Sequence, residues 1–135
     1  MLKNTCDKKR WFFVESHQQK TVKVEEEGKT IKIFHQNIRG LGNKTNELYC
    51  HLHHDFPHVL CISEHHLRES ELWLTHLANY YLGAGYCRKN FLKGGVSIFV
   101  YRNLKYNNIN IDEFKIDKDI EACAIHCLTE NITMC

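Results

Sequence analysis

The strongest pattern of hydrophobic and polar positions in this chain lies between Ile31 and Leu67. Ile31–Gln36 is a short apolar run rich in isoleucine and phenylalanine, which is typical of a buried strand. Apolar residues then recur at every fourth position, as on one face of a helix: Leu48, Leu52 and Phe56. Val59–Ile62 is a continuous apolar run, as in a strand that is covered on both faces. The pattern therefore predicts a strand, a helix and a second strand.

Turn-forming residues separate these three elements. Gly40 and Gly42 permit a sharp exit from the first strand. Asn43 or Thr45 is expected to cap the helix that follows, and Pro57 is expected to end it. A strand, a crossover helix and a second strand form a parallel pair with a right-handed connection, so both strands end at the same edge of the sheet.

Asn37 comes directly after the first apolar run and Glu64 follows the second run after Ser63, so both lie at that shared edge. Ligands of open α/β sheets bind at this edge. An amide and a carboxylate brought together there suit a hard cation such as Mg²⁺ together with a phosphate group. The alternative is that Asn37 only starts a turn and that Glu64 is a solvated strand end. The residues alone leave both interpretations open.

The rest of the chain predicts further short elements around this unit. Residues 68–80 carry leucines and Trp73 among acids and polar residues, which favours a short helix. Arg102–Phe114 is polar and rich in asparagine, which indicates a connection with one weak strand. Strands are predicted at Tyr80–Cys87, Val96–Tyr101 and Ile120–Leu128, and a tight turn at Thr129–Asn131 leads into Ile132.

Residues 1–29 differ from the rest because lysines, acids and glutamines dominate them. This composition predicts a poorly ordered polar leader over residues 1–29 and a folded domain over residues 30–135. The alternative is a marginal hairpin with short strands at Trp11–Val14 and Thr21–Val24. The basic residues Lys8–Arg10 fit a nuclear localisation signal or, more simply, a solvated segment.

Composition limits the class of protein without naming a function. The 135 residues are 43% hydrophobic and 25% charged, which is an ordinary globular balance for one domain. A net charge of +2 is too small to argue for nucleic-acid binding by itself. The seven cysteines are scattered and no signal-peptide pattern opens the chain, so we expect reduced thiols in an intracellular protein of the cytoplasm or nucleus. No apolar run has the length of a membrane span, so no membrane partner is expected.

Two motifs give the chain a family resemblance. Q-N-I-R-G-L at Gln36–Leu41 and S-E-H-H-L at Ser63–Leu67 resemble motifs of the endonuclease/exonuclease/phosphatase superfamily. More narrowly, they are similar to the apurinic-type endonuclease domain that opens the reverse transcriptase polyprotein of non-LTR retrotransposons, the insect Jockey-like elements especially. Gly94–Val100 is similar to the family's G-G-V-A-I-L-V strand, and Ile120–Ile125 to its next strand, often written L-E-x-x-x-V.

The resemblance covers about Ile31 to Cys135 and implies a truncated half of a four-layer α/β sandwich with the DNase I-like fold. It implies that Asn37 positions the scissile phosphate and the attacking water, and that Glu64 is a ligand of the catalytic Mg²⁺. The family's I-Y-x-P, G-D-F-N and S-D-H motifs are expected beyond Cys135. The parent activity would be Mg²⁺-dependent phosphodiester hydrolysis that nicks target DNA for reverse transcription.

The same resemblance sets the expected partners and activity. DNA is the expected partner of the intact domain, with contacts from Arg39, Lys44 and Arg68. The fragment alone is expected to be inactive, and to self-associate because the inner faces of Val96–Val100 and Ile120–Leu128 would lose their cover. The alternative is a non-enzymatic relic or domesticated interaction module that keeps the fold.

Three other chemistries are weaker. The stretch from Gly40 to Thr45 has the place of a phosphate-binding loop, but Ile38 and Asn43 stand where that motif needs glycine. Histidines and cysteines are dense between residues 50 and 66, yet no C-x-x-C pair occurs, so surface histidines and core thiols are expected rather than a zinc site. Cys87 beside Arg88 is the best candidate for a nucleophile and is expected to be inert.

Overall fold

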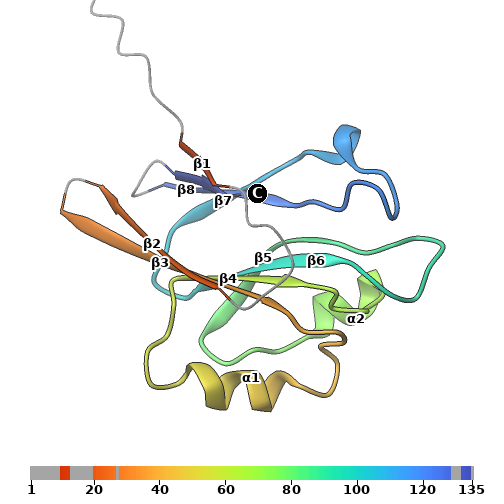
Figure 1. Cartoon of the computed structure of the whole chain (residues 1–135), viewed down its shortest axis with the longest axis horizontal. Helices are drawn as coiled ribbons and strands as arrows, with labels where there is room; N and C mark the ends of the chain where they lie inside the picture. The colour runs from red at the N-terminus through yellow and green to blue at the C-terminus, as the bar shows by residue number, and fades with distance from the viewer. Residues whose placement is uncertain (1–9, 13–19, 27, 129–131, 135) are drawn as a thin grey trace, which may run out of the picture.

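Two β-sheets face each other in this protein, and the helices lie on the far side of the larger sheet (Figure 1). The computed structural model describes residues 10–12, 20–26, 28–128 and 132–134. Within these residues the larger sheet has the order β2–β3–β4–β6–β5, with strands β2 (Lys20–Glu26), β3 (Lys29–Asn37), β4 (Val59–Ser63), β6 (Val96–Tyr101) and β5 (Tyr80–Tyr86). The smaller sheet has the order β1–β9–β8–β7, with strands β1 (Arg10–Phe12), β9 (Ile132–Met134), β8 (Ala124–Cys127) and β7 (Tyr106–Ile109).

The helices complete a third layer. Helices α1 (Thr45–Leu52) and α2 (Glu69–Leu74) bury Leu48, Leu52 and Leu72 in a core with residues of the larger sheet. A short 3₁₀ turn, Asp112–Phe114, lies in the connection from β7 to β8. The described part of the chain is therefore a small mixed α/β domain with a layer of helices, a five-stranded mixed sheet and a four-stranded sheet. No helix in it is long and apolar enough to cross a lipid bilayer.

Strand β4 is the central strand of the larger sheet. All five of its residues are buried, and it pairs in parallel with β3 and antiparallel with β6. Val59 and Cys61 belong to the core between the two sheets, whereas Leu60 and Ile62 belong to the core beneath the helices. The continuous apolar run follows from this position, because a strand that is covered on both faces has no wet face for polar residues.

The predicted unit of strand, helix and strand is present as β3, α1 and β4. The parallel register pairs Ile33 with Val59 at one end and Asn37 with Ser63 at the other. This register confirms that the two strands end at the same edge. The predicted capping is wrong, because Lys44 is the N-cap residue and no side-chain hydrogen bond caps α1. The helix also ends at Leu52, well before Pro57.

Part of the predicted leader belongs to the larger sheet. Lys20–Glu26 forms β2, which pairs antiparallel with β3 across a turn at Gly28, whose φ is 79°. Val24 is 4% exposed and packs in the core between the sheets. The prediction of a poorly ordered segment is therefore wrong for residues 20–26. The alternative correctly placed a strand at Thr21–Val24, but the predicted hairpin is wrong in its pairing, because β2 pairs with β3 and β1 pairs with β9. Residues 1–9, 13–19, 27, 129–131 and 135 lie outside the described residues, and so does the predicted turn at Thr129–Asn131.

The two sheets bury each other's inner faces. Ile98 of β6 is 2% exposed and Ile125 of β8 is 0% exposed, and both pack in the same core. The prediction that Val96–Val100 and Ile120–Leu128 would have uncovered inner faces is therefore wrong, because the smaller sheet covers the larger one. The self-association expected on that ground stays a prediction without this support. The strand predicted from Ile120 is also shorter, since β8 begins at Ala124.

Replacement of Ile125 tests the contact between the sheets. We expect Ile125→Ala to lower the free energy of unfolding by about 2–5 kcal/mol, because it removes buried methylene groups and leaves a cavity. Urea denaturation followed by circular dichroism measures this loss. Ile120→Ala is the matched control, since Ile120 is 48% exposed and the change should cost less than about 0.5 kcal/mol. Equal and small losses in the two variants would contradict the sheet-on-sheet packing.

Candidate functional site

The candidate site lies at the edge where β3 and β4 end. Asn37 is the last residue of β3 and is paired with Ser63, the last residue of β4; Glu64 follows directly. The sequence-predicted adjacency of Asn37 and Glu64 on parallel strands is thus confirmed. The groove of about 1040 Å³ beside α2 and the hollow of about 470 Å³ beside α1 include neither residue in their lining, and a depression shared by the two side chains stays a prediction.

The chain continues to form backbone hydrogen bonds beyond the ends of these strands. The N–H groups of Ile38, Gly40 and Leu41 donate to the carbonyl oxygens of Ser63, Glu64 and His65 at 3.1, 2.8 and 2.9 Å. On the other side, the N–H groups of His65 and His66 donate to the carbonyls of Gly95 and Gly94 at 3.4 and 2.9 Å. Three segments that are distant in sequence are therefore joined around residues 64–66.

His65 anchors this junction from inside the protein. The side chain is 0% exposed; its Nδ1 accepts a hydrogen bond from the Leu67 N–H, and its Nε2 lies 2.9 Å from the carbonyl oxygen of Tyr86. An N–H must donate to Nδ1 and a carbonyl must accept from Nε2, so the ring is neutral with its proton on Nε2. Burial, and then the nearby His66, lower the pKa of His65 from 6.5 to about 4.

Two glycines make room for the His65 ring and for Arg88. Gly94 and Gly95 have φ values of 92° and 86°, in the region that favours glycine. A Cβ on Gly95 would collide with the His65 ring, and a Cβ on Gly94 would collide with the Arg88 guanidinium. The G-G pair that the sequence shows before β6 is therefore explained by close approach as well as by backbone conformation.

Glu121 is a structural residue of this edge that sequence reasoning missed. Its carboxylate accepts hydrogen bonds from the Gly95 N–H at 2.8 Å, from the Lys118 N–H at 3.2 Å and from Nε of Arg88. Its side chain is 14% exposed. The carboxylate thus ties the connection before β8 to the glycine pair before β6. The signal in the sequence is the single acid of I-E-A-C at residues 120–123, which stands among apolar residues of the predicted strand Ile120–Leu128.

Two buried polar atoms of the residues at this edge have no hydrogen-bond partner. Oδ1 of Asn37 and Nε2 of His66 are buried and have no hydrogen-bond partner. Oε2 of Glu64 lies 3.5 Å from Nε2 of His66. Arg39, Glu64 and His66 have φ values of 47°, 52° and 58°, a left-handed conformation that non-glycine residues rarely adopt. Strained backbone and unsatisfied polar atoms are typical of sites that bind a ligand.

The described residues do not by themselves form a magnesium site. Mg²⁺ takes near-octahedral oxygen ligands and is usually bound by carboxylates together with substrate phosphates. At this edge the strand ends supply the Glu64 carboxylate and the Asn37 amide oxygen. No group of three or more His, Cys, Asp or Glu side chains that could hold a metal ion occurs among the residues that the structure covers. Further oxygen ligands would have to come from elsewhere.

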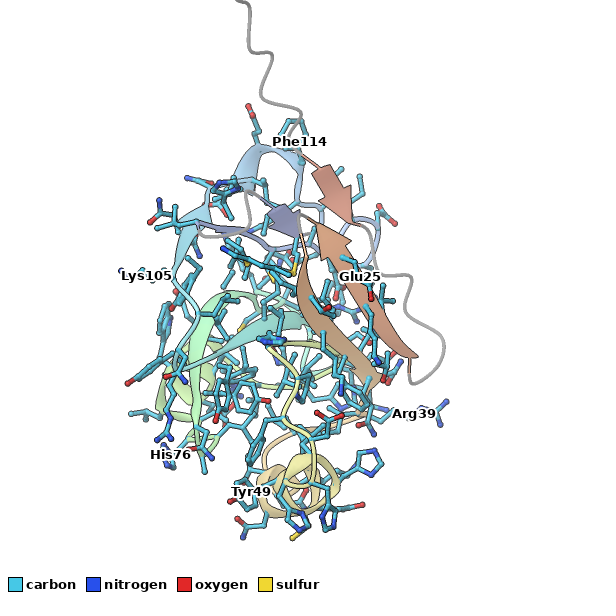
Figure 2. All side chains as sticks on the ribbon, turned by 90° about the vertical axis from the view of Figure 1, so that its left-hand side faces the viewer. Glu25, Arg39, Tyr49, His76, Lys105 and Phe114 are labelled. Carbon is cyan, nitrogen blue, oxygen red and sulfur yellow. The ribbon has the colours of Figure 1, made fainter. Side chains whose placement is uncertain are left out.

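The predicted DNA-contact residues have three different settings. Arg39 is exposed and points away from the body of the molecule (Figure 2). Nζ of Lys44 donates to the carbonyl of Ile38 at 2.8 Å and to that of Arg39 at 3.3 Å, so its ammonium holds the loop after β3. Arg68 is exposed at the start of α2 and lines the groove there.

Cys87, the predicted candidate for a nucleophile, has the properties of an inert thiol. Burial, and then Glu69 and Glu71, raise the pKa of Cys87 to about 11, so this thiol stays protonated at neutral pH. Its Sγ lies 3.9 Å from Nε2 of His65, which is itself neutral. Cys61, Cys123 and Cys127 are buried and in no disulfide. These observations argue against nucleophilic catalysis by Cys87.

Comparison with known proteins adds no assignment. No protein-family model matches the chain, and no curated protein matches it. The candidate site therefore depends on its geometry and chemistry.

Acid should weaken the fold through His65. The imidazole titrates near pH 6.5 when unfolded and near pH 4 when folded, so between these values the unfolded chain binds more protons. We expect the contribution of neutral His65 to the free energy of unfolding to be complete above about pH 6.5. The free energy of unfolding should then fall, by up to about 3 kcal/mol, as the pH is lowered to 4. Urea denaturation at a series of pH values measures this slope.

Two variants separate His65 from the other titrating groups. His65→Gln should be less stable at neutral pH and should show a flatter pH dependence, because it removes the titrating group. His76→Gln changes an exposed histidine and should keep the slope of the unmodified protein. An unchanged slope in His65→Gln would contradict a buried neutral imidazole.

Proposed function

We propose that this chain is the N-terminal half of a phosphodiesterase domain of the endonuclease/exonuclease/phosphatase type, from a non-LTR retrotransposon or a relic of one. The observation that carries the proposal is the register of β3 and β4, which brings Asn37 and Glu64 to one carboxyl edge. These are the two positions at which the motifs of the resemblance need an amide and a carboxylate.

The layers are compatible with this proposal. A four-layer α/β sandwich has two facing sheets with helices on both outer faces. The described residues supply helices, the five-stranded sheet and a smaller sheet that packs against it. In the proposed parent domain, further strands and the second layer of helices would extend and cover the smaller sheet.

The proposed reaction is hydrolysis of a phosphodiester bond, which nicks target DNA for reverse transcription. The Asn37 amide would donate a hydrogen bond to a phosphate oxygen, and the Glu64 carboxylate would supply negative charge beside it. In the family, Mg²⁺ supplies charge neutralisation when it is bound. The strand ends supply only the Glu64 carboxylate and the Asn37 amide oxygen as ligands for Mg²⁺. In this proposal, the remaining oxygen ligands and the general base belong to the half of the domain that carries G-D-F-N and S-D-H.

A second candidate function is an interaction module that keeps the fold without catalysis. The groove beside α2 favours it, because exposed apolar side chains line this groove: Trp73, Phe91 and Leu92 are 65%, 42% and 72% exposed. Exposed apolar residues gathered at a groove are typical of protein-binding surfaces. This candidate predicts that no half-domain restores hydrolysis.

Nicking of supercoiled plasmid tests the enzymatic proposal. The chain alone should not nick in Mg²⁺ or Mn²⁺, because catalytic groups that act as a unit lose nearly all activity when members are missing. Fusion to the C-terminal half of an intact relative should restore nicking. Within that fusion, Asn37→Ala or Glu64→Gln should lower the rate by about 10²–10³, the usual cost of removing a stabilising group.

Glu47→Gln is the control in the same fusion, since Glu47 is exposed on α1 and should leave the rate unchanged. Nicking by the chain alone that disappears in Glu64→Gln would show that the active site is already complete. A fusion that folds but does not nick would favour the interaction module.

A further inference from the structure

Strand β1 forms the outer edge of the smaller sheet, where it pairs with β9 (Figure 1). The two strands run parallel, in a register that extends from Arg10 beside Ile132 to Phe12 beside Met134. The opposite edge of β9 is paired antiparallel with β8. The next described strand after β1 is β2, which belongs to the larger sheet. The pairing with β9 is therefore what places β1 in the smaller sheet.

The pairing of β1 is short. It spans three residues, whereas β2, at the edge of the larger sheet, pairs with β3 over seven residues. Parallel pairing is also slightly less stable per residue than antiparallel pairing. A short edge strand opens at a much lower free energy than a core strand, because only its ladder to one neighbour has to break. We therefore expect β1 to leave β9 while both sheets stay folded.

Strand β9 keeps its own place in the core when its outer neighbour leaves. Met134, at the register position of Phe12, is 2% exposed and packs in the core between the sheets. The antiparallel ladder to β8 holds β9 from the other side. A strand edge that loses its neighbour presents unpaired N–H and C=O groups, which pair readily with another extended segment. The outer edge of β9 is therefore a preformed site for one extended segment.

The direction of β1 indicates which segment belongs there. In the proposed parent domain, the chain continues from β9 into the half that carries G-D-F-N and S-D-H. Consecutive strands of a chain are neighbours about two-thirds of the time, and a crossover connection makes them parallel. Because β8 occupies one edge of β9, a parallel strand that follows β9 would take the edge that β1 occupies here.

We propose that β1 is an exchangeable strand, and that the edge of β9 binds a parallel strand of the C-terminal half in its place. The inference rests on the proposed function for the identity of that incoming strand. β1 covers the edge until the C-terminal half arrives, and so keeps it from templating aggregation. It also lowers the apparent affinity for the C-terminal half, because only the fraction of chains with β1 released can bind.

Hydrogen exchange on the unmodified chain tests whether β1 opens separately from the core. The amides of β1 should exchange at least about a hundredfold faster than those of β4, whose five residues are all buried. The amides of β4 should stay protected while those of β1 exchange. Equal protection of the two strands would contradict the proposal, because β1 would then open only when the whole domain unfolds.

A synthetic peptide with the sequence of residues 8–14, K-K-R-W-F-F-V, probes the edge of β9 without the C-terminal half. Successive N–H groups of a strand point to opposite edges, so the double variant Trp11→Pro/Phe12→Pro removes the one that donates to β9. This variant should bind the peptide about 2- to 10-fold more tightly than the unmodified chain, the range that one net hydrogen bond contributes.

Two observations control the peptide experiment. A peptide with prolines in place of its Trp and second Phe-preceding pair, K-K-R-P-P-F-V, should not bind, because it lacks the same N–H group. NMR shifts of the Thr133 and Met134 amides show whether the peptide binds at β9. Equal affinity of the double-proline variant and the unmodified chain would contradict the proposal, because β1 would then not compete for this edge. Circular dichroism shows that the variant is folded.

The C-terminal half of an intact relative, added as a separate polypeptide, tests the identity of the incoming strand. It should bind the Trp11→Pro/Phe12→Pro variant about 2- to 10-fold more tightly than the unmodified chain. Lys3→Pro/Asn4→Pro is the matched control, since it places the same change before β1 and should leave the affinity unchanged. A dimer of the unmodified chain that is lost in Trp11→Pro/Phe12→Pro would overturn the proposal, because β1 of a second copy would then occupy the edge.

Failure of this inference and failure of the proposed function are distinct. A C-terminal half that restores nicking but binds the unmodified chain and the Trp11→Pro/Phe12→Pro variant equally well overturns the inference alone. Peptide exchange at β9 without any binding of the C-terminal half overturns the proposed function and the identity of the incoming strand, whereas the exchange of β1 stands.

Discussion

The burial of β4 on both faces is the constraint on which the rest of the structure depends. Its residues fill two cores in alternation, and both of its edges are paired with neighbouring strands. A charged side chain in this strand would lose its water without gaining a partner, at a high cost in free energy. Glu64 is the first residue after the strand at which a carboxylate can reach solvent. The candidate chemistry is therefore confined to the carboxyl edge by the packing of the core.

The same edge shows how a rigid junction forms without regular secondary structure. Residues 64–66 are hydrogen bonded on one side to the loop after β3 and on the other to the glycine pair before β6. Left-handed conformations at Glu64 and His66 each cost about 1–2 kcal/mol, and the surrounding hydrogen bonds offset this cost. Buried His65 contributes two of these bonds through its ring. The polar residues on either side of it are thereby held toward the surface.

The local pattern of hydrophobic residues predicted strands β3 and β4 at the centre of the fold, but not the pairing of the edge strand β2 or the role of Glu121. The run at Val59–Ile62 is buried on both faces, and the run at Ile31–Gln36 contributes residues to the core on each side of the sheet, so their hydrophobicity alone defines them as strands. Strand β2 was predicted only as an alternative, because an edge strand that carries Lys20, Lys23 and two glutamates resembles a solvated segment. Asn37 and Glu64 could be predicted because a strand end is a local feature. The role of Glu121 could not, because its hydrogen bonds to Gly95 and Arg88 join residues 26 and 33 positions apart.

The ring of His65 occupies the space that any side chain other than that of glycine would need at position 95. We therefore expect the two positions to change together in related sequences. A lineage that replaces Gly95 must also replace His65 with a smaller residue, and the carbonyl of Tyr86 then loses its imidazole donor. Relatives that keep the junction should show glycine and histidine together, and relatives that have lost it should show both positions changed. Covariation of this pair would therefore show, from sequences alone, which relatives keep the junction at the carboxyl edge.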